Sequence, residues 1–314
     1  MMPSRVRIAG DSAKSEKPAG PRLTVVTAAE LSETERVDEG AAATVPGPST
    51  SGAGGTPAES TESLEPTEAL LAELAEVSER LEQAGPAQIL AWTAARFAPR
   101  FTMATAFGPE GMVLIHLLSE VAPSTPIFNL DTGYQFPETL AMIDRIRDRY
   151  GLEVERKQPA LTVAEYERVH AGPVYRHDPN RCCHDRKLAV LREAIRGMHC
   201  WASAIRRDQS PDRARTPIVG WDAKFGLVKV SPLANWTKKD VWRFISDHDV
   251  PYNPLHDAGY PSIGCAPCTR PVLPGEDERA GRWSGFAKTE CGLHSLDDQT
   301  SAAGERRTAD DRRS

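Results

Sequence analysis

Apolar residues recur three to four positions apart over residues 70–81, which is the spacing of one helix face. The pattern stops at a Gly-Pro pair, and Pro86 suits the first turn of a second helix that runs to about Phe97. Further along, short apolar runs alternate with helical patterns. These runs predict strands over residues 101–107, 126–130, 152–155, 200–205 and 226–230.

The turns between these segments fit a parallel sheet. A Gly-Pro-Glu-Gly turn follows the strand 101–107 and leads into a helix, and an Asp-Thr-Gly turn follows the strand 126–130 before a helix from Pro137 to about residue 146. Strand, turn and helix repeated in this order predict an α/β fold with a doubly wound, mainly parallel sheet. Thr237 and Asp240 have the spacing of a capping box at the start of a later helix.

The chain divides by composition into three parts. Residues 1–62 contain no Trp, Phe, Tyr, Cys or His and are rich in small and polar residues. Such a segment cannot bury enough apolar area to offset its chain entropy, so we predict a disordered extension. We expect one α/β domain over residues 63–285 and a C-terminal tail over residues 286–314.

Charge and cysteine content exclude several classes of protein. The 314 residues include 38 Lys plus Arg and 44 Asp plus Glu, and this net charge of -6 argues against a nucleic-acid partner. No apolar run approaches the roughly 18 residues of a membrane span, and no apolar stretch of a secretory signal follows the N-terminus. Six cysteines without such a signal fit a cytoplasmic protein with metal-bound or catalytic thiols.

Four cysteines form two pairs that suggest a metal centre. Cys265 and Cys268 lie three apart on a Gly/Pro-rich turn, and Cys182 and Cys183 are adjacent. Spacing alone favours zinc, with an iron–sulfur cluster second and redox or structural thiols third. The adjacent pair departs from the zinc-ribbon pattern, because neighbouring side chains diverge in a strand. A cubane with four separate irons accepts that divergence more readily than one tetrahedral ion.

Basic residues next to the adjacent pair point the same way. Arg181, Arg186 and Lys187 flank it, and on a helix Lys187 returns to the face of Cys183. A [4Fe–4S] core with four thiolates carries a charge of about -2, which nearby cations offset. A solvated helix face would show the same charges. Cys200 opens an apolar strand and is expected in the core.

The remaining chemistry lies in a tail cysteine and two arginine groups. Cys291 follows Lys288 in a polar, Gly-containing stretch, so it is either a movable nucleophilic thiol or an incidental surface cysteine. Arginines cluster over residues 206–213 and 279–282, either as surface charge or as a site for phosphate or sulfate oxygens. The turn before Gly111 is either an ordinary βα turn or an anion site, where backbone N–H groups at the start of the helix would face the ligand at the carboxyl edge of the sheet. It lacks the Lys-Ser/Thr pair of a Walker A loop. Together these features favour a phosphate- or sulfate-bearing nucleotide as ligand.

Six stretches of the chain carry a family resemblance, which covers about residues 85–295. They are Thr105-Ala-Phe-Gly-Pro-Glu110, Leu130-Asp-Thr-Gly-Tyr-Gln-Phe-Pro-Glu-Thr139, Cys182-Cys183-x-x-x-Lys187, Arg206-Arg-Asp-Gln-Ser-Pro211, Ser262-Ile-Gly-Cys-Ala-Pro-Cys-Thr-Arg-Pro271 and Glu290-Cys-Gly-Leu-His294. In this order and spacing they resemble the assimilatory adenylylsulfate (adenosine 5′-phosphosulfate, APS) reductases of the larger APS/PAPS reductase family. The cysteine pairs are typical of the iron–sulfur APS branch, whereas the cluster-free PAPS reductases keep the Cys-Gly-Leu-His tail but lack both pairs.

The resemblance implies a fold and a role for each matching residue. The fold would be adenine-nucleotide α-hydrolase-like (ATP pyrophosphatase-like), and Cys182, Cys183, Cys265 and Cys268 would hold a [4Fe–4S] cluster. Cys291 would be the nucleophile in a mobile tail, with His294 at the substrate, and Lys187 would lie between cluster and substrate. The site for the adenosine and phosphosulfate would be lined by Thr105, Phe107, Gly108 and Leu130. The phosphosulfate itself would be bound by Arg213, Arg279 and Arg282.

The resemblance also implies a reaction. The Cys291 thiolate would attack the sulfur of APS and release AMP, and a thioredoxin dithiol would then release sulfite from the cysteine S-sulfonate, in sulfate assimilation and cysteine biosynthesis. A homo-oligomer is compatible with this reading. PAPS reduction, a tRNA-sulfurating ATP pyrophosphatase and a zinc-stabilised nucleotide-binding module without activity are the alternatives. The missing loop lysine speaks against the pyrophosphatase.

Overall fold

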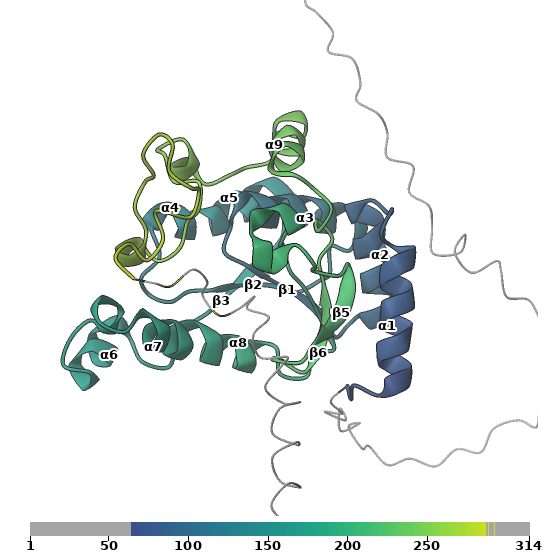
Figure 1. The fold of residues 1–314 in the computed structure, drawn as a ribbon, viewed down its shortest axis with the longest axis horizontal. Helices are drawn as coiled ribbons and strands as arrows, with labels where there is room; N and C mark the ends of the chain where they lie inside the picture. The colour runs from purple at the N-terminus through teal and green to yellow at the C-terminus, as the bar shows by residue number, and fades with distance from the viewer. Residues whose placement is uncertain (1–63, 287, 289–291, 293–314) are drawn as a thin grey trace, which may run out of the picture. The chain divides into compact units, whose positions relative to one another are not determined.

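The computed structural model describes residues 64–286, 288 and 292. The extension predicted over residues 1–62 and most of the predicted tail, including Cys291 and His294, lie outside the described residues. The described part holds a six-stranded sheet with strand order β3-β2-β1-β4-β6-β5 (Figure 1). Its strands are β1 (Phe101–Thr105), β2 (Ile127–Leu130), β3 (Val154–Lys157), β4 (Cys200–Ala202), β5 (Val219–Asp222) and β6 (Leu227–Val230).

The strand pairings confirm the predicted mainly parallel sheet. β1 pairs in parallel with β2 and β4, β2 with β3, and β4 with β6, while β5 alone runs antiparallel to β6. The α-helices are α1 (Glu68–Arg80), α2 (Pro86–Phe97), α3 (Pro109–Val121), α4 (Pro137–Leu140), α5 (Met142–Tyr150), α6 (Val163–Val169), α7 (Pro179–Cys183), α8 (Ala189–Ala194) and α9 (Lys238–Asp247).

Helices cover both faces of the sheet, as a doubly wound fold requires. In Figure 1, α3, α4 and α5 lie on one side of the strands and α6, α7 and α8 on the other. Successive strand residues point to opposite faces, so Ile127 packs with the helices of the first side and Phe128 with α8. Cys200 belongs to the first cluster with no exposed surface, which confirms its predicted place in the core, and Trp201 belongs to the second.

The element boundaries differ from the predicted ones at several points. The first strand ends at Thr105 because Phe107 adopts a left-handed backbone conformation, with φ of 58°. The predicted helix from Pro137 divides at Ala141 into α4 and α5, and β3 begins two residues later than predicted. The antiparallel strand β5 was not predicted, because its sequence Val-Gly-Trp-Asp shows no alternation of buried and exposed residues.

The strand order creates a switch point between β1 and β4. From β1 the chain continues to β2 and β3 on one side, and only then crosses to β4 on the other side. The loops after β1 and β4 therefore leave the sheet in opposite directions, and ligands of open α/β sheets bind in the crevice between such loops. Among the described helices, none has the length and apolar composition needed to cross a membrane.

Candidate active site

A cleft of about 540 Å³ opens at this switch point, at the carboxyl ends of the central strands. Residues after β1, β2 and β4 form one wall of this cleft, and residues of the C-terminal segment 261–283 form the opposite wall. Most of the predicted substrate residues line it: Thr105, Gly108, Leu130, Lys187, Arg213, Arg279 and Arg282.

The turn between β1 and α3 is tightly built. The Phe107 N–H donates to Oγ1 of Thr105 over 3.0 Å, and the Phe107 side chain is only 1% exposed, in the core rather than on the cleft. A Cβ atom on Gly111 would lie 2.9 Å from Thr105 Oγ1, so the helix can approach the strand this closely only with glycine there. The buried Phe107 side chain thus supports the turn from the core side. Only the backbone of Phe107 could contact a ligand in the cleft.

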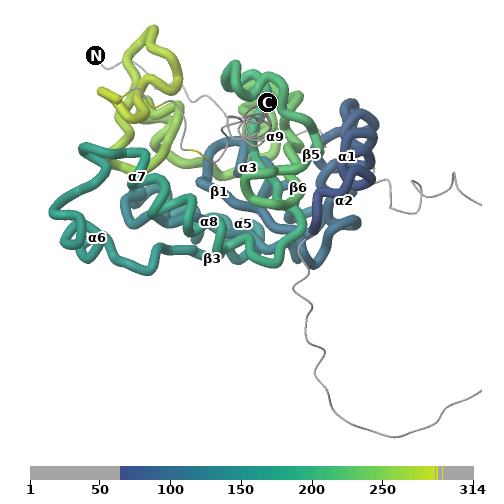
Figure 2. Tube along the Cα trace, turned by 60° about the horizontal axis from the view of Figure 1, so that its bottom comes forward, coloured from purple at the N-terminus to yellow at the C-terminus, as the bar shows by residue number. Residues whose placement is uncertain are grey.

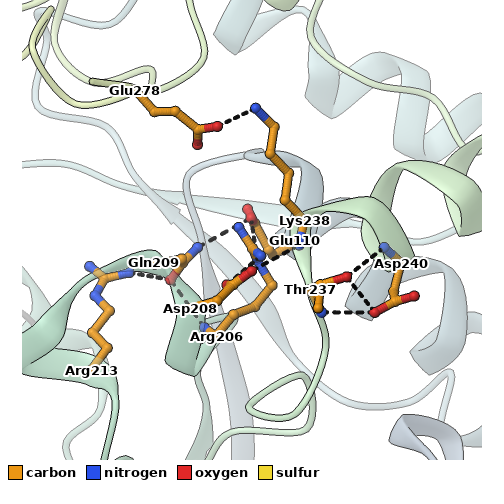
Figure 3. Close-up of polar contacts among 9 residues, drawn as sticks. All are labelled: Glu110, Arg206, Asp208, Gln209, Arg213, Thr237, Lys238, Asp240 and Glu278. Atoms are coloured by element: carbon orange, nitrogen blue, oxygen red, sulfur yellow. Dashed lines mark hydrogen bonds and ion pairs between the residues drawn. The ribbon is translucent and has the colours of Figure 1, made fainter. Parts of the chain in front are cut away.

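A carboxylate lies at the start of α3, beside the cleft. Oε1 of Glu110 accepts hydrogen bonds from Nε of Arg206 over 3.0 Å and from Nε2 of Gln209 over 3.2 Å. Arg206 follows β4, and its side chain is only 4% exposed. The start of α3 and the loop after β4, which flank the switch point, are therefore joined by an ion pair with the buried Arg206 (Figure 3).

This polar network extends from the strand ends to the opposite wall. Gln209 accepts a hydrogen bond from Arg213 over 2.5 Å, and Asp208 pairs with Arg206 over 2.5 Å. Asp208 also accepts from the backbone N–H of Lys238, at the first residue of α9. The Lys238 ammonium reaches across to Glu278 on the C-terminal wall (Figure 3).

The capping box predicted for α9 is confirmed. Thr237 caps the helix through Asp240, and each residue bonds the backbone of the other. The cap fixes the start of α9 next to the cleft, which is why Lys238 can reach both walls. His256 also lines the cleft, and burial lowers its pKa.

Both cysteine pairs line a second, smaller pocket that adjoins the cleft. Cys182 and Cys183 end the short helix α7, which continues into a π-helical turn over His184–Leu188. Lys187, one turn further on, lines both the cleft and this pocket, as does Arg282. Figure 2 shows the yellow-green C-terminal segment next to α7, which agrees with this shared pocket.

Backbone hydrogen bonds hold the second cysteine pair in place. The Ala266 N–H donates to the Tyr134 carbonyl over 2.7 Å, and the Trp283 N–H donates to the Cys268 carbonyl over 2.9 Å. The Arg270 N–H donates to the carbonyl of Gly281, where a Cβ atom would lie 2.2 Å from the Arg270 carbonyl oxygen. This close pairing of two chain segments brings Arg282 and Trp283 alongside the cysteine turn.

The electrostatics of the cysteine pocket differ from those of the cleft. Burial, and after it the neighbouring cysteines, raise the pKa of Cys182 to about 12 and that of Cys268 to about 12. Oγ1 of Thr132 lies 3.2 Å from Sγ of Cys265. Among residues 64–286, 288 and 292, no three His, Cys, Asp or Glu side chains are grouped to hold one metal ion. None of the five cysteines described there forms a disulfide.

Two described residues of the tail lie beside α7 and the turn after it. The Lys288 ammonium bonds Oδ1 of Asn180 over 2.5 Å and lies 5.2 Å from the centre of the Trp283 ring. A Cβ atom on Gly292 would lie 3.2 Å from Leu188. The chain on either side of residues 289–291 is thus next to the stretch that carries Cys183 and Lys187.

Several cleft residues were not predicted to have a role in the site. Glu110 and Gln209 lie inside the family-like stretches 105–110 and 206–211, so the motif itself contained the signal. Lys238 directly follows the capping residue Thr237, and nothing in its local pattern distinguishes it from an exposed helix lysine.

Fold and cleft together define an α/β protein that binds its ligand at a switch point. The family model for the phosphoadenosine phosphosulfate (PAPS) reductase domain matches residues 100–271. The adenosine 5′-phosphosulfate reductase 1 of Bacillus subtilis (strain 168) is 48% identical over 211 residues, which cover 67% of this chain and 91% of that protein. The adenosine 5′-phosphosulfate reductase of Geobacillus thermodenitrificans (strain NG80-2) is 47% identical over 214 residues, 68% of this chain and 91% of that protein.

A solved structure shows the same fold. The PAPS reductase of Candida auris, in its phosphate complex, matches with a TM-score of 0.58 and 24% identity over 67% of this chain and 100% of that chain. This likeness confirms the predicted fold class. The chain belongs to the APS/PAPS reductase family.

Proposed function

We propose that this protein is an oxidoreductase that converts adenosine 5′-phosphosulfate to sulfite and AMP in sulfate assimilation. One observation carries the proposal: the cleft at the switch point shares Lys187 and Arg282 with a pocket lined by four cysteines. Cations there suit a phosphosulfate, and the names of the relatives support the substrate.

The cysteine pocket suits a [4Fe–4S] cluster held by Cys182, Cys183, Cys265 and Cys268. Burial and the neighbouring cysteines raise the pKa of Cys182 and of Cys268, so these thiols in the shared pocket become thiolates only around a cationic core. Adjacent Cys182 and Cys183 at the end of α7 fit four separate irons better than one tetrahedral zinc. When bound, the cluster supplies a charged group beside the cleft that tunes the substrate site.

Cys291 is the proposed nucleophile. Its thiolate forms a bond to the sulfonate sulfur of APS, and the bond from that sulfur to the phosphate oxygen breaks, so AMP leaves with the electron pair. A thioredoxin thiolate then bonds to Sγ of Cys291 and sulfite leaves with the electron pair of the broken S–S bond. The second thioredoxin thiol then attacks the thioredoxin sulfur of this mixed disulfide, the S–S bond to Cys291 breaks, and Cys291 leaves as a thiolate. The disulfide formed in thioredoxin balances the two-electron reduction of the sulfur.

The cleft residues have separate tasks in this reaction. Lys187, Arg213, Arg279 and Arg282 would stabilise the charge that develops on AMP and on the sulfonate. Thr105, Gly108 and Leu130 would line the nucleoside, while Phe107 shapes the turn and His294 completes the site from the tail.

The remaining parts of the proposal concern the whole chain. We assign residues 63–285 to the nucleotide and cluster domain and residues 286–314 to a tail that carries the nucleophile, supported by the contacts of Lys288 and Gly292 with the α7 region. Thioredoxin is the proposed donor, in a reducing cytosol.

The first prediction tests the nucleophile. Replacing Cys291 by Ser leaves the cysteine pocket intact, so we expect full iron content and unchanged AMP binding. The rate of sulfite release should fall by at least about 10³-fold, because the attacking thiolate is gone. Intact-mass measurement after incubation with APS should show a sulfonate on the wild type and none on the variant. A sulfonate on C291S would assign the attack to another thiol.

A further inference from the structure

We propose that Glu110 makes the cleft accept a ribose 3′-hydroxyl and reject a 3′-phosphate, so that it selects APS over PAPS. This inference rests on the proposed function, since it concerns the substrate class of the same cleft. It follows from how the charges are distributed along the cleft and from the partners that hold the Glu110 carboxylate.

The two ends of the cleft differ in charge. The end that adjoins the cysteine pocket contains Lys187 and Arg282. The end between the loops after β1 and β4 contains Glu110 and Asp208, which share Arg206, and Arg213, which is held by Gln209. A phosphosulfate carries about two negative charges, so it is attracted to the first end and repelled by the carboxylates of the second. The uncharged nucleoside part is left to face Glu110.

Glu110 occupies the place where an anion would otherwise bind. It is the second residue of α3, whose N-terminal N–H groups favour negative charge. While Oε1 is held by Arg206 and Gln209, Oε2 turns back to within 3.6 Å of the position of a Cβ atom on Gly108. The protein's own carboxylate thus fills the helix terminus, and a second phosphate would have to displace it.

The cations at this end are already bonded to side chains of the same chain, and Arg213 donates to the neutral Gln209. Arg206 pairs with both Glu110 and Asp208, and Lys238 pairs with Glu278. A 3′-phosphate would therefore meet a like charge before it met an available cation. In dinucleotide-binding folds a carboxylate accepts from a ribose hydroxyl, whereas an arginine accommodates a phosphate at the same position. Because Glu110 pairs with Arg206, this arginine does not bind a 3′-phosphate, and the Glu110 carboxylate repels that phosphate.

The test is the isosteric variant Glu110→Gln, whose amide oxygen can still accept from Arg206. For wild type and variant, kcat/KM is measured with APS and with PAPS, and the affinities for AMP and adenosine 3′,5′-bisphosphate are measured by calorimetry. We expect the wild type to prefer APS by about 100-fold or more. E110Q should reduce that preference at least about tenfold, mainly through a lower KM for PAPS and tighter binding of the bisphosphate.

Two further variants make the test specific. Glu110→Asp keeps the charge and should keep the preference within about threefold. Glu73→Gln removes one negative charge from the exposed surface of α1, where Glu73 pairs with Arg96, and should leave the preference unchanged. If E110Q lowers activity on both substrates equally, or if the wild type prefers PAPS, the inference is wrong. If neither substrate is reduced by the wild type, the proposed function fails, while the binding ratio of the two nucleotides still tests Glu110.

Discussion

The two sides of the cleft are built on opposite electrostatic principles. On the strand-end side, each carboxylate has a cation of the same chain: Glu110 and Asp208 share the buried Arg206. On the cysteine side, groups of the same kind are gathered together, and the thiols of Cys182 and Cys268 are raised in pKa by burial and then by their cysteine neighbours. One side is satisfied by the protein alone, and the other would be completed by the proposed cluster.

The two sides also differ in how they form. The strand-end side forms when β1 and β4 pair, because its members leave the ends of those strands. The cysteine side joins α7 to a C-terminal turn and has few apolar contacts of its own, with Cys182 packed only in a small cluster around Tyr166 and Val174. We therefore expect substitutions on the cysteine side to reduce iron content and activity, and substitutions on the strand-end side to reduce stability.

The largest expected effect comes from removing one cysteine ligand. Cys265→Ser should lose its iron, with the absorbance near 400 nm and the sulfite-forming activity falling together, the activity by at least about 10³-fold. The reason is that the remaining thiols cannot hold the cluster, while the sheet and cleft still fold. Iron analysis, absorbance of anaerobically purified protein and circular dichroism check the three parts of this expectation.

The matched control is a cysteine outside the pocket. Cys200 lies fully buried in β4, so Cys200→Ala should keep its iron and lose only stability, by about 1 kcal/mol for a small cavity. Full activity in a colourless, zinc-containing Cys265→Ser protein would contradict the cluster and favour a structural zinc site instead.

An intermediate effect is expected from the buried arginine of the strand-end side. Arg206→Met leaves Glu110 and Asp208 as neighbouring carboxylates without their shared cation. Breaking such a pair while its partners stay partly buried should lower the free energy of unfolding by about 2–3 kcal/mol. For a domain of this size, that is a fall of about 5–10 °C in the melting temperature, measured by calorimetry with iron content unchanged.

An exposed pair gives the control for this variant. Arg96 pairs with Glu73 at the surface, where both side chains are 47% exposed, so Arg96→Met should change stability by less than about 1 kcal/mol. Equal losses in the two variants would mean that Arg206 does not hold the strand-end side together. Loss of iron in Arg206→Met would mean that the two sides are not independent.

The pattern of residues predicts much of this fold but not the pairing across the cleft. Periodicity and the capping box of Thr237 and Asp240 place most helices and parallel strands, because those signals are local. The bonds from Arg206 and Gln209 to Glu110 join residues 96 and 99 positions apart, so they depend on the strand order, which local patterns do not contain.

Two other features escape prediction for physical reasons of their own. Phe107 turns into the core because its left-handed backbone reverses the chain before α3, and a motif gives no direction for a side chain. The cysteine pairs were predicted to meet, and both do line one pocket, with the adjacent pair at the end of α7. Spacing decides which residues can meet, and tertiary structure decides which atoms face the ligand.

The smallest expected effect concerns the ion pair that joins the two walls. Lys238 on the strand-end side and Glu278 on the C-terminal wall are 48% and 52% exposed, so solvent screens most of their attraction. We expect Lys238→Met and Glu278→Gln each to shift the melting temperature by less than about 2 °C, with a coupling energy of at most about 1 kcal/mol in a double-mutant cycle. Added salt should reduce that coupling further. A larger coupling energy would show that the two walls unfold as one unit. The strand-end side and the C-terminal wall would then not contribute independently to stability.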